Sequence, residues 1–326
     1  MCKGREYTLN VIDRTLKSLY KKKKYGELSS LYKIFNKKLG DTIVAVLSEE
    51  LKLHDSTRAF ERIYVDFQWI DKIPLAAFVH PQTDINGNLI DSKTELGDLF
   101  IQYRHNNVWD NSGNSGAHQY CHRSLIVQAK IASEDNPKVP IGRVGKNKKA
   151  NPTSKEIKLL EEWPEFDLYE TSGSKSPLAK NLVVSKSGLP FAFFGGFSTS
   201  SQNWSFGNAK YGEVCSKNFS QLVIELAKNE AGKELSTDAA WETVSREITK
   251  ICSNRNLPPS IAKKIESRNA TAKVQGGIAY SFPAQLSYWI TLAYEKIVSL
   301  VRGKKMLVVT IDRVSYEGSG VSQFRR

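Results

Sequence analysis

The chain has 326 residues, of which 40% are hydrophobic and 25% are charged, and its formal net charge is +13. These values are typical of a globular protein with a sizeable core, built as one elaborated domain or two. No apolar run approaches the roughly 18 residues that a membrane-spanning helix needs, so we expect no membrane partner. The positive charge favours a polyanionic partner, although a generally solvated basic surface would have the same composition.

The cysteines and the N-terminus bear on the compartment. The four cysteines are widely spaced and form no CxxC pair, and the first residues include no apolar signal region. We therefore expect free thiols and a reducing, cytoplasmic setting.

Helices are predicted over most of residues 7–54. Asp41 is expected to cap a helix over residues 42–53, in which Ile43, Val46 and Leu47 share one face. Glu50 continues that face, because it lies three and four residues after Leu47 and Val46. Glu49 and Glu50 are also read as ordinary carboxylates on the surface of a helix.

Strands are predicted next, and two of them carry polar groups. Residues 63–69 alternate as a half-buried strand does. Residues 95–101 form a short apolar segment in which Asp98 follows a glycine, and residues 125–130 form a second one with Gln128 and Lys130. Side chains two apart leave the same face of a strand, so Gln128 and Lys130 share a face. If the two segments pair, a carboxylate, an amide oxygen and an ammonium group meet; otherwise Gln128 and Lys130 simply face water from an edge strand.

This arrangement resembles the restriction-endonuclease-like nuclease superfamily. The signature of that superfamily is Asp, a variable gap, then Glu, Asp or sometimes Gln, any residue, and Lys, which matches Asp98 and Gln128-Ala129-Lys130. The resemblance implies an α/β fold with a mixed central sheet flanked by helices, here with helical elaborations at both ends. It also implies a metal-dependent endonuclease that cuts nucleic acid, with double-stranded DNA favoured, in restriction or phage defence.

The resemblance assigns roles to particular residues. Asp98 would anchor Mg²⁺ or Mn²⁺, with the amide oxygen of Gln128 and the backbone carbonyl of Ala129 as further ligands. Lys130 would orient the attacking water or stabilise developing charge. Enzymes of this superfamily often aim a helix glutamate at the metal, and Glu50 is the matching candidate, with Glu49 as the fallback. Gln in place of Glu removes one negative charge, which Glu50 would help to restore.

The rest of the chain completes the predicted organisation. A capping box at residues 153–156 predicts a helix that ends near Trp163, followed by a strand over 166–169. A hairpin of residues 182–184 and 191–194 is expected at the sheet margin, then a loop over 195–203. Helices are predicted over 219–231, 237–251 and 284–301, and a final strand over 306–311. The predicted regions are 1–56 (helical, contributing a core helix), 57–200 (nuclease-like core) and 201–326 (mainly helical).

A basic segment over residues 137–152 would lie near the active edge and hold phosphates. Its cationic residues are Lys138, Arg143, Lys146, Lys148 and Lys149. A solvated basic loop is the alternative interpretation. His105, His118, Cys121 and His122 have no spacing typical of a zinc site and are expected to be loop or substrate-contact residues.

Two other functions are compatible with the sequence. One is a catalytically inactive nucleic-acid-binding protein on the same fold, and the other is a basic interaction subunit of a larger complex. A homodimer or a partner protein is left open, because cutting both strands needs two active sites or two visits by one.

Overall fold

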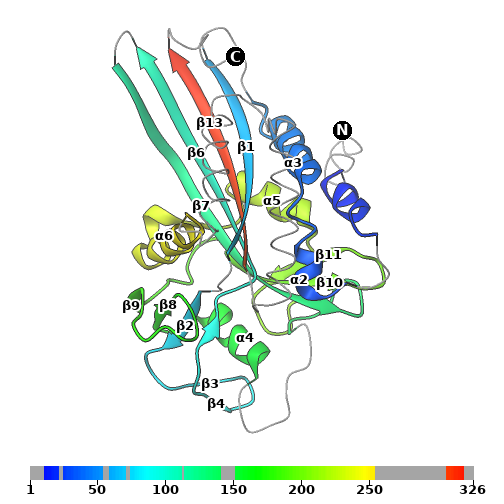
Figure 1. The fold of residues 1–326 in the computed structure, drawn as a ribbon, viewed down its shortest axis with the longest axis vertical. Coiled ribbons are helices and arrows are strands. Elements are labelled where there is room, and N and C mark those ends of the chain that lie inside the picture. Colours follow the sequence, from blue (N-terminus) through cyan, green and yellow to red (C-terminus); the bar gives the residue numbers. More distant parts are fainter. Residues whose placement is uncertain are drawn as a thin grey trace, which may run out of the picture.

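The computed structural model describes residues 11–21, 25–53, 59–70, 74–111, 114–140, 151–253 and 306–318. Within these ranges the fold is mixed α/β, as predicted, and is built on a seven-stranded mixed sheet (Figure 1). None of the helices in these ranges is long and apolar enough to cross a bilayer.

The main sheet gathers strands from distant parts of the chain. Its strands are β1 (Ala59–Ile70), β6 (Leu99–Asn111), β7 (Asn114–Ala132), β10 (Ala192–Ser198), β11 (Trp204–Asn208), β12 (Lys233–Glu234) and β13 (Met306–Gly318). The order is β1-β13-β6-β7-β10-β11, and β12 pairs with β7. The β6–β7 pair is antiparallel, whereas β10 runs parallel to β7 and β13 parallel to β6.

Two smaller sheets lie below the main one. The second sheet contains β2 (Leu75–Phe78), β5 (Thr94–Glu95), β8 (Phe166–Tyr169) and β9 (Ala179–Leu182), and a two-stranded sheet contains β3 (Gln82–Thr83) and β4 (Leu89–Ile90). The predicted strand over 166–169 is therefore present as β8, but it belongs to the second sheet.

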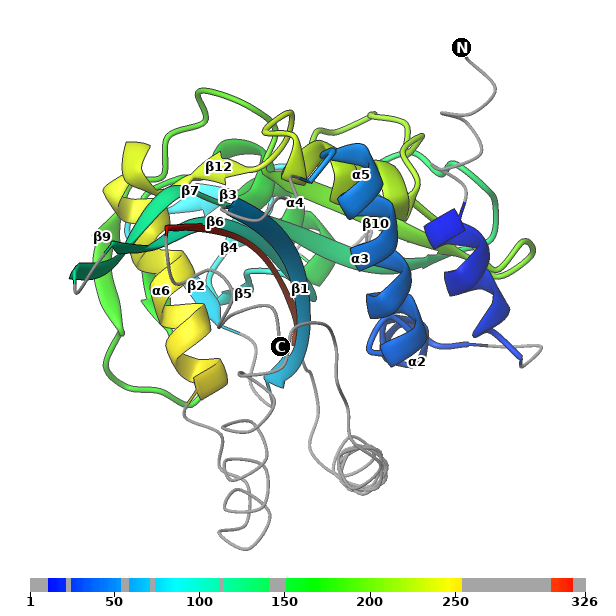
Figure 2. The same ribbon diagram turned by 90° about the horizontal axis from the view of Figure 1, so that it is seen from above.

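Helices cover both faces of the main sheet. Besides a helix over residues 11–18, they are α2 (Glu27–Leu31), α3 (Lys37–Glu50), α4 (Pro152–Glu162), α5 (Phe219–Ala227), the 3₁₀ helix η1 (Leu235–Thr237) and α6 (Ala239–Ser253). Helices α3 and α5 pack in one hydrophobic core, and α4 and α6 pack in the other, on the opposite face (Figures 1 and 2). The helix predicted over 284–301 lies outside the described residues.

The last strand occupies the centre of the sheet. The segment predicted over 306–311 is longer, and as β13 it pairs with β1 on one side and with β6 on the other. Leu307, Val309 and Ile311 enter one core while Met306 and Val308 enter the other. A strand buried on both faces explains the nearly continuous apolar sequence of this segment.

Two predicted helix starts are wrong, for the same physical reason. Helix α3 begins at Lys37, because the Asn36 side chain accepts a hydrogen bond from the backbone N–H of Lys38, so Asp41 lies inside the helix. Helix α4 is capped by Asn151, which accepts from the backbone N–H of Ser154, and not by a capping box at 153–156. In both cases an upstream asparagine satisfies the free N–H groups first.

The predicted hairpin at the sheet margin is also wrong. Strand β9 pairs with β8, whereas β10 pairs with β7 and β11. Residues 195–198, predicted as loop, continue β10. A Cβ at Gly195 would lie 2.8 Å from the Phe206 ring, so this glycine allows close packing of β10 and β11 and does not mark a turn.

The central position of β13 gives a first prediction. A chain that ends at residue 305 loses the strand that joins β1 to β6, which leaves two long apolar strand edges unpaired. We expect this truncated protein to be insoluble or to show no cooperative thermal unfolding by circular dichroism. A chain that ends at Gly318 keeps every described strand pairing and is the matched control. A cooperative transition in the shorter chain would contradict the central role of β13.

Candidate functional site

Strands β6 and β7 bring Asp98, Gln128 and Lys130 together at one end of the sheet. Leu99 pairs with Val127, which places Asp98, just before β6, beside the Gln128 segment. The Asp98 carboxylate accepts a hydrogen bond from the backbone N–H of Ala129 at 2.9 Å and another from the Gln128 side-chain amide. Asp98 is only 3% exposed, and Gln128 is fully buried.

A glycine permits this close approach. A Cβ at Gly97 would lie 2.8 Å from the Ile126 side chain and 2.9 Å from the Val127 carbonyl oxygen. The Asp98 backbone N–H donates to the same Val127 carbonyl at 2.9 Å. Glycine therefore lets the chain enter β6 against β7, and this approach sets the position of the Asp98 side chain.

Lys130 has a partner that the sequence did not indicate. Its ammonium group lies 3.0 Å from the Glu156 carboxylate of α4, and Glu156 is only 2% exposed. The sequence contains a signal for this position, because Glu156, Leu159 and Leu160 have the spacing of one helix face, and both leucines are buried. Because Asn151 caps α4, Glu156 lies inside the helix and is not a capping residue.

A second carboxylate that the sequence analysis did not select acts on the site from α2. Glu27, the first residue of α2, raises the pKa of both Asp98 and Lys130 through its negative charge. This short helix follows a glycine, and no periodic pattern in the sequence marks Glu27 as inward-facing. Its role in the site became apparent only from the packing of α2 beside β7.

Glu50 does not join the cluster, which corrects the predicted role. It forms an ion pair with Lys228, the residue after α5. The buried face of α3 contacts the core that contains Val127 and Ala129, whereas the side chains of Gln128 and Lys130 alternate to the other face. The sequence predicted the inward face of α3 correctly but not which face of the sheet it covers. Glu49, the fallback candidate, is exposed.

The protonation equilibria reflect crowding of charge. Burial raises the pKa of the Asp98 carboxyl well above its usual range, and Glu27 and Glu156 add to this rise while Lys130 opposes it. Burial alone would lower the pKa of Lys130, but Glu156, Asp98 and Glu27 together raise it. Lys130 is therefore held as a cation, and Asp98 favours either a proton or another positive charge.

The donor set suits a hard cation that keeps most of its waters. The buried Oε1 atom of Gln128 has no hydrogen-bond partner among the described residues. No group of three Asp, Glu, His or Cys side chains in the described ranges is placed to hold a metal ion. A site here would therefore combine the Asp98 carboxylate with amide and backbone carbonyl oxygens, as Mg²⁺ accepts.

The other predicted residues that the structure describes have partners outside this cluster. Lys138 is exposed, and its backbone forms an isolated β-bridge with Val214. The other four cationic residues, Arg143, Lys146, Lys148 and Lys149, lie outside the described residues. His105 contacts Ser315 at 2.8 Å, His122 contacts Gln102 at 3.1 Å, and Cys121 contacts Asn229 at 3.2 Å. These separate partners do not support a shared zinc site. The expectation of loop residues is wrong, because His105 lies in β6 and the other three lie in β7, which pair along their length.

No family model, curated protein or solved structure matches this chain. The function must therefore be inferred from the site itself. Its distinguishing feature is a half-buried lysine beside buried acidic and amide groups where β6 begins beside β7.

The raised pKa of Asp98 predicts a stability effect. In metal-free buffer at pH 7, Asp98→Asn should raise the free energy of unfolding by about 1–2 kcal/mol, because the amide keeps hydrogen-bonding capacity without burying a charge. A raised folded-state pKa lowers stability as the pH rises above the ordinary value of 3.8. The stability that Asp98→Asn adds should therefore become smaller as the pH falls toward 3.8. Urea unfolding of both proteins between pH 3.5 and pH 8 measures this difference.

Asp238 is the matched control, because its pKa is lowered whereas that of Asp98 is raised. Burial would raise the pKa of Asp238, but N–H donors from Trp241 and Ser185 together with Lys233 lower it. Its contribution to stability is present above the ordinary pKa and is lost as the pH falls. Asp238→Asn should therefore destabilise the protein at pH 7. Equal effects of the two substitutions at neutral pH would contradict the crowding of charge around Asp98.

Proposed function

We propose that this protein is a metal-dependent nuclease with a restriction-endonuclease-like core, which hydrolyses phosphodiester bonds in nucleic acid, with double-stranded DNA as the favoured substrate. The observation that carries the proposal is the convergence of Asp98, Gln128 and Lys130 where β6 begins beside β7. A role in restriction or phage defence follows from the resemblance of the motif.

The connection of the strands supports the same proposal. Strand β7 continues through a crossover that contains α4 to β10, which lies parallel to β7. The chain thus has a strand that follows Asp98, a strand with Gln128 and Lys130, a helix, and a further strand in the main sheet. That is the element order that a core of this superfamily requires.

The cation would be held by the Asp98 carboxylate, the free amide oxygen of Gln128 and the backbone carbonyl of Ala129. The N–H and C=O groups of one strand residue leave the same edge, and the N–H of Ala129 is directed at Asp98. A bound Mg²⁺ or Mn²⁺ would supply an activated water and neutralise charge on the phosphate.

The protein's own groups have distinct roles in this proposal. Lys130 is too strongly held as a cation to act as a base, so it stabilises negative charge on the phosphate or the leaving oxygen. Glu156 positions the ammonium group of Lys130 from α4. Glu27 supplies the negative charge that the neutral Gln128 lacks. The resemblance had assigned this role to Glu50.

One observation favours a second candidate. Gln128 is neutral and its amide donates to Asp98, so a site that only binds nucleic acid, without cutting it, has the same contacts. The basic interaction subunit receives no specific support from the described residues. Cutting activity separates the first two possibilities.

Cleavage of plasmid DNA in Mg²⁺ or Mn²⁺ tests the proposal. Asp98→Ala removes the anchoring ligand and Lys130→Ala removes the cation at the phosphate, so each should lower the cutting rate at least about 100-fold. Lys180→Ala, at an exposed position in β9, is the control and should cut as the wild type does. Cutting that survives both site substitutions would place the activity elsewhere, and the absence of cutting with intact binding would favour the inactive binding protein.

Substitutions of Glu27 and Glu50 test which of the two glutamates acts on the site. Glu27→Gln should lower the cutting rate about tenfold or more, because it removes a carboxylate that acts on both Asp98 and Lys130. Glu50→Gln weakens only the ion pair with Lys228 and should leave the cutting rate unchanged. The two rates are compared at saturating metal. The reverse pattern would restore the role first predicted for Glu50.

A further inference from the structure

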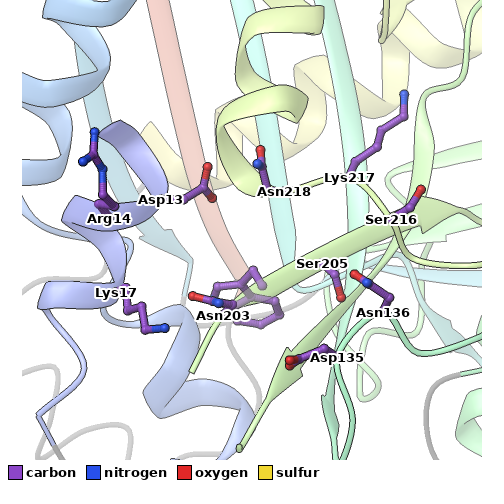
Figure 3. A pocket seen from close by; sticks show the side chains of 11 residues that line it. Asp13, Arg14, Lys17, Asp135, Asn136, Asn203, Ser205, Ser216, Lys217 and Asn218 are labelled. Atoms are coloured by element: carbon purple, nitrogen blue, oxygen red, sulfur yellow. The ribbon is translucent and has the colours of Figure 1, made fainter. Parts of the chain in front are cut away.

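A second feature of the molecule is a cavity of about 530 Å³ beside β11, the last strand of the main sheet. Its lining comes from the helix over residues 11–18, the segment after β7, strand β11 and the residues that lead into α5 (Figure 3). This volume lies in the range of cavities that hold small organic ligands. Almost all of the side chains that line it are polar.

One lining residue points to a ligand. The Ser205 hydroxyl is buried without a hydrogen-bond partner in the described part of the chain, and the residue is only 8% exposed. A buried hydroxyl without a partner is costly, so its presence in a cavity wall calls for an explanation. A polar ligand in the cavity would satisfy it.

The cavity lies close to the proposed cleavage site. Lys130 of β7 pairs with Gly196 of β10, and Gly196 pairs with Ser205 of β11. Paired residues in adjacent strands direct their side chains to the same face, and two strand spacings amount to about 10 Å. Gly196 contributes no side chain between Lys130 and Ser205. A chain bound at Lys130 can therefore reach the Ser205 end of the cavity within one or two residues.

We propose that this cavity holds one nucleotide unit of a single-stranded or locally opened nucleic acid, next to the phosphate at Lys130; the inference rests on the proposed nuclease function. The exposed Asn136 and Asn203 side chains border the cavity. Each amide offers donors and acceptors that match base edges. The Ser205 hydroxyl would bond a sugar hydroxyl or a base atom at the buried end.

The charges around the cavity decide where the phosphate lies. Asp13 already accepts the backbone N–H groups of Phe219 and Ser220, at 3.0 Å and 3.3 Å, and Asp135 accepts the Ser201 hydroxyl at 2.5 Å. These carboxylates are thus held by protein donors at the start of α5 and at the β10–β11 turn.

The cationic side chains that line the cavity differ in their surroundings. Lys217 pairs with Glu225 at 2.5 Å, whereas Arg14 and Lys17 are exposed on the helix over residues 11–18. The phosphate of the nucleotide is therefore assigned to Lys17, which is exposed and lies near enough to Asp135 for its charge to act on that carboxylate. Binding should weaken with salt because of this contact.

Binding of a fluorescent eight-nucleotide DNA strand to the full-length protein in EDTA tests the proposal. Ser205→Val fills the buried end and Ser205→Ala removes only the hydroxyl, while Lys17→Glu reverses the charge. We expect about tenfold weaker binding for Ser205→Val and Lys17→Glu, and a smaller loss for Ser205→Ala. Lys38→Glu, at an exposed position in α3, is the matched control for charge and should bind as the wild type does. Thermal unfolding confirms that each variant is folded.

The outcomes separate this inference from the proposed function. Wild-type binding by the folded Ser205 and Lys17 variants would overturn the nucleotide site even if Asp98-dependent cutting is observed. Weakened binding in those variants, without cutting by any form, would keep the nucleotide site and overturn the nuclease. Competition by a deoxynucleoside monophosphate at lower concentration than the strand would identify a free nucleotide as the source of the ligand.

Discussion

The structure depends on one residue at the junction of three strands. The Asp98 backbone N–H donates to Val127 of β7, and its carbonyl accepts the N–H of Leu307 of β13 at 2.8 Å. Its side chain accepts the N–H of Ala129, again in β7. Gly97 makes this approach possible, because any Cβ there would meet the backbone of β7. The alignment of β6, β7 and β13 and the position of the carboxylate are therefore set together.

The charge cluster is better explained by function than by stability. A buried ion pair such as Lys130–Glu156 gains little over apolar packing, because desolvation offsets most of the attraction. Burial raises the pKa of the Asp98 carboxyl, and the charges of Glu27 and Glu156 raise it further, which is unfavourable for the ionised form. Titratable groups with strongly shifted pKa values that gather in one place are a physical signature of binding and catalytic sites.

The sequence predicts what is local and fails where distant segments meet. Gln128 and Lys130 share a face because alternation along a strand requires it, and Gly97 before Asp98 is visible in the sequence. The spacing of Glu156 marks the inward face of α4, but its contact with Lys130 depends on the crossover between β7 and β10, and Glu27 reaches the site only through the packing of α2. Glu50 lies on the correct face of its helix, but the face of the sheet that α3 covers is a tertiary choice. For the same reason, β13 could be recognised as a strand but not placed between β1 and β6.

The proposed nuclease site has Gln128 at the position where the superfamily that it resembles usually has an acidic residue, and the neighbours of Gln128 are consistent with this difference. The carboxylates of Asp98, Glu27 and Glu156 and the ammonium of Lys130 amount to two formal negative charges when all are ionised. A divalent cation balances that charge, whereas an acidic residue at 128 would leave an excess in a buried site. Without the cation, the same imbalance is relieved by a proton on Asp98, which its raised pKa favours. Metal binding should then displace that proton, so the affinity for the cation increases with pH until Asp98 is ionised. Because Glu27 and Glu156 already add two carboxylates, a neutral residue at position 128 suits the charge of the site.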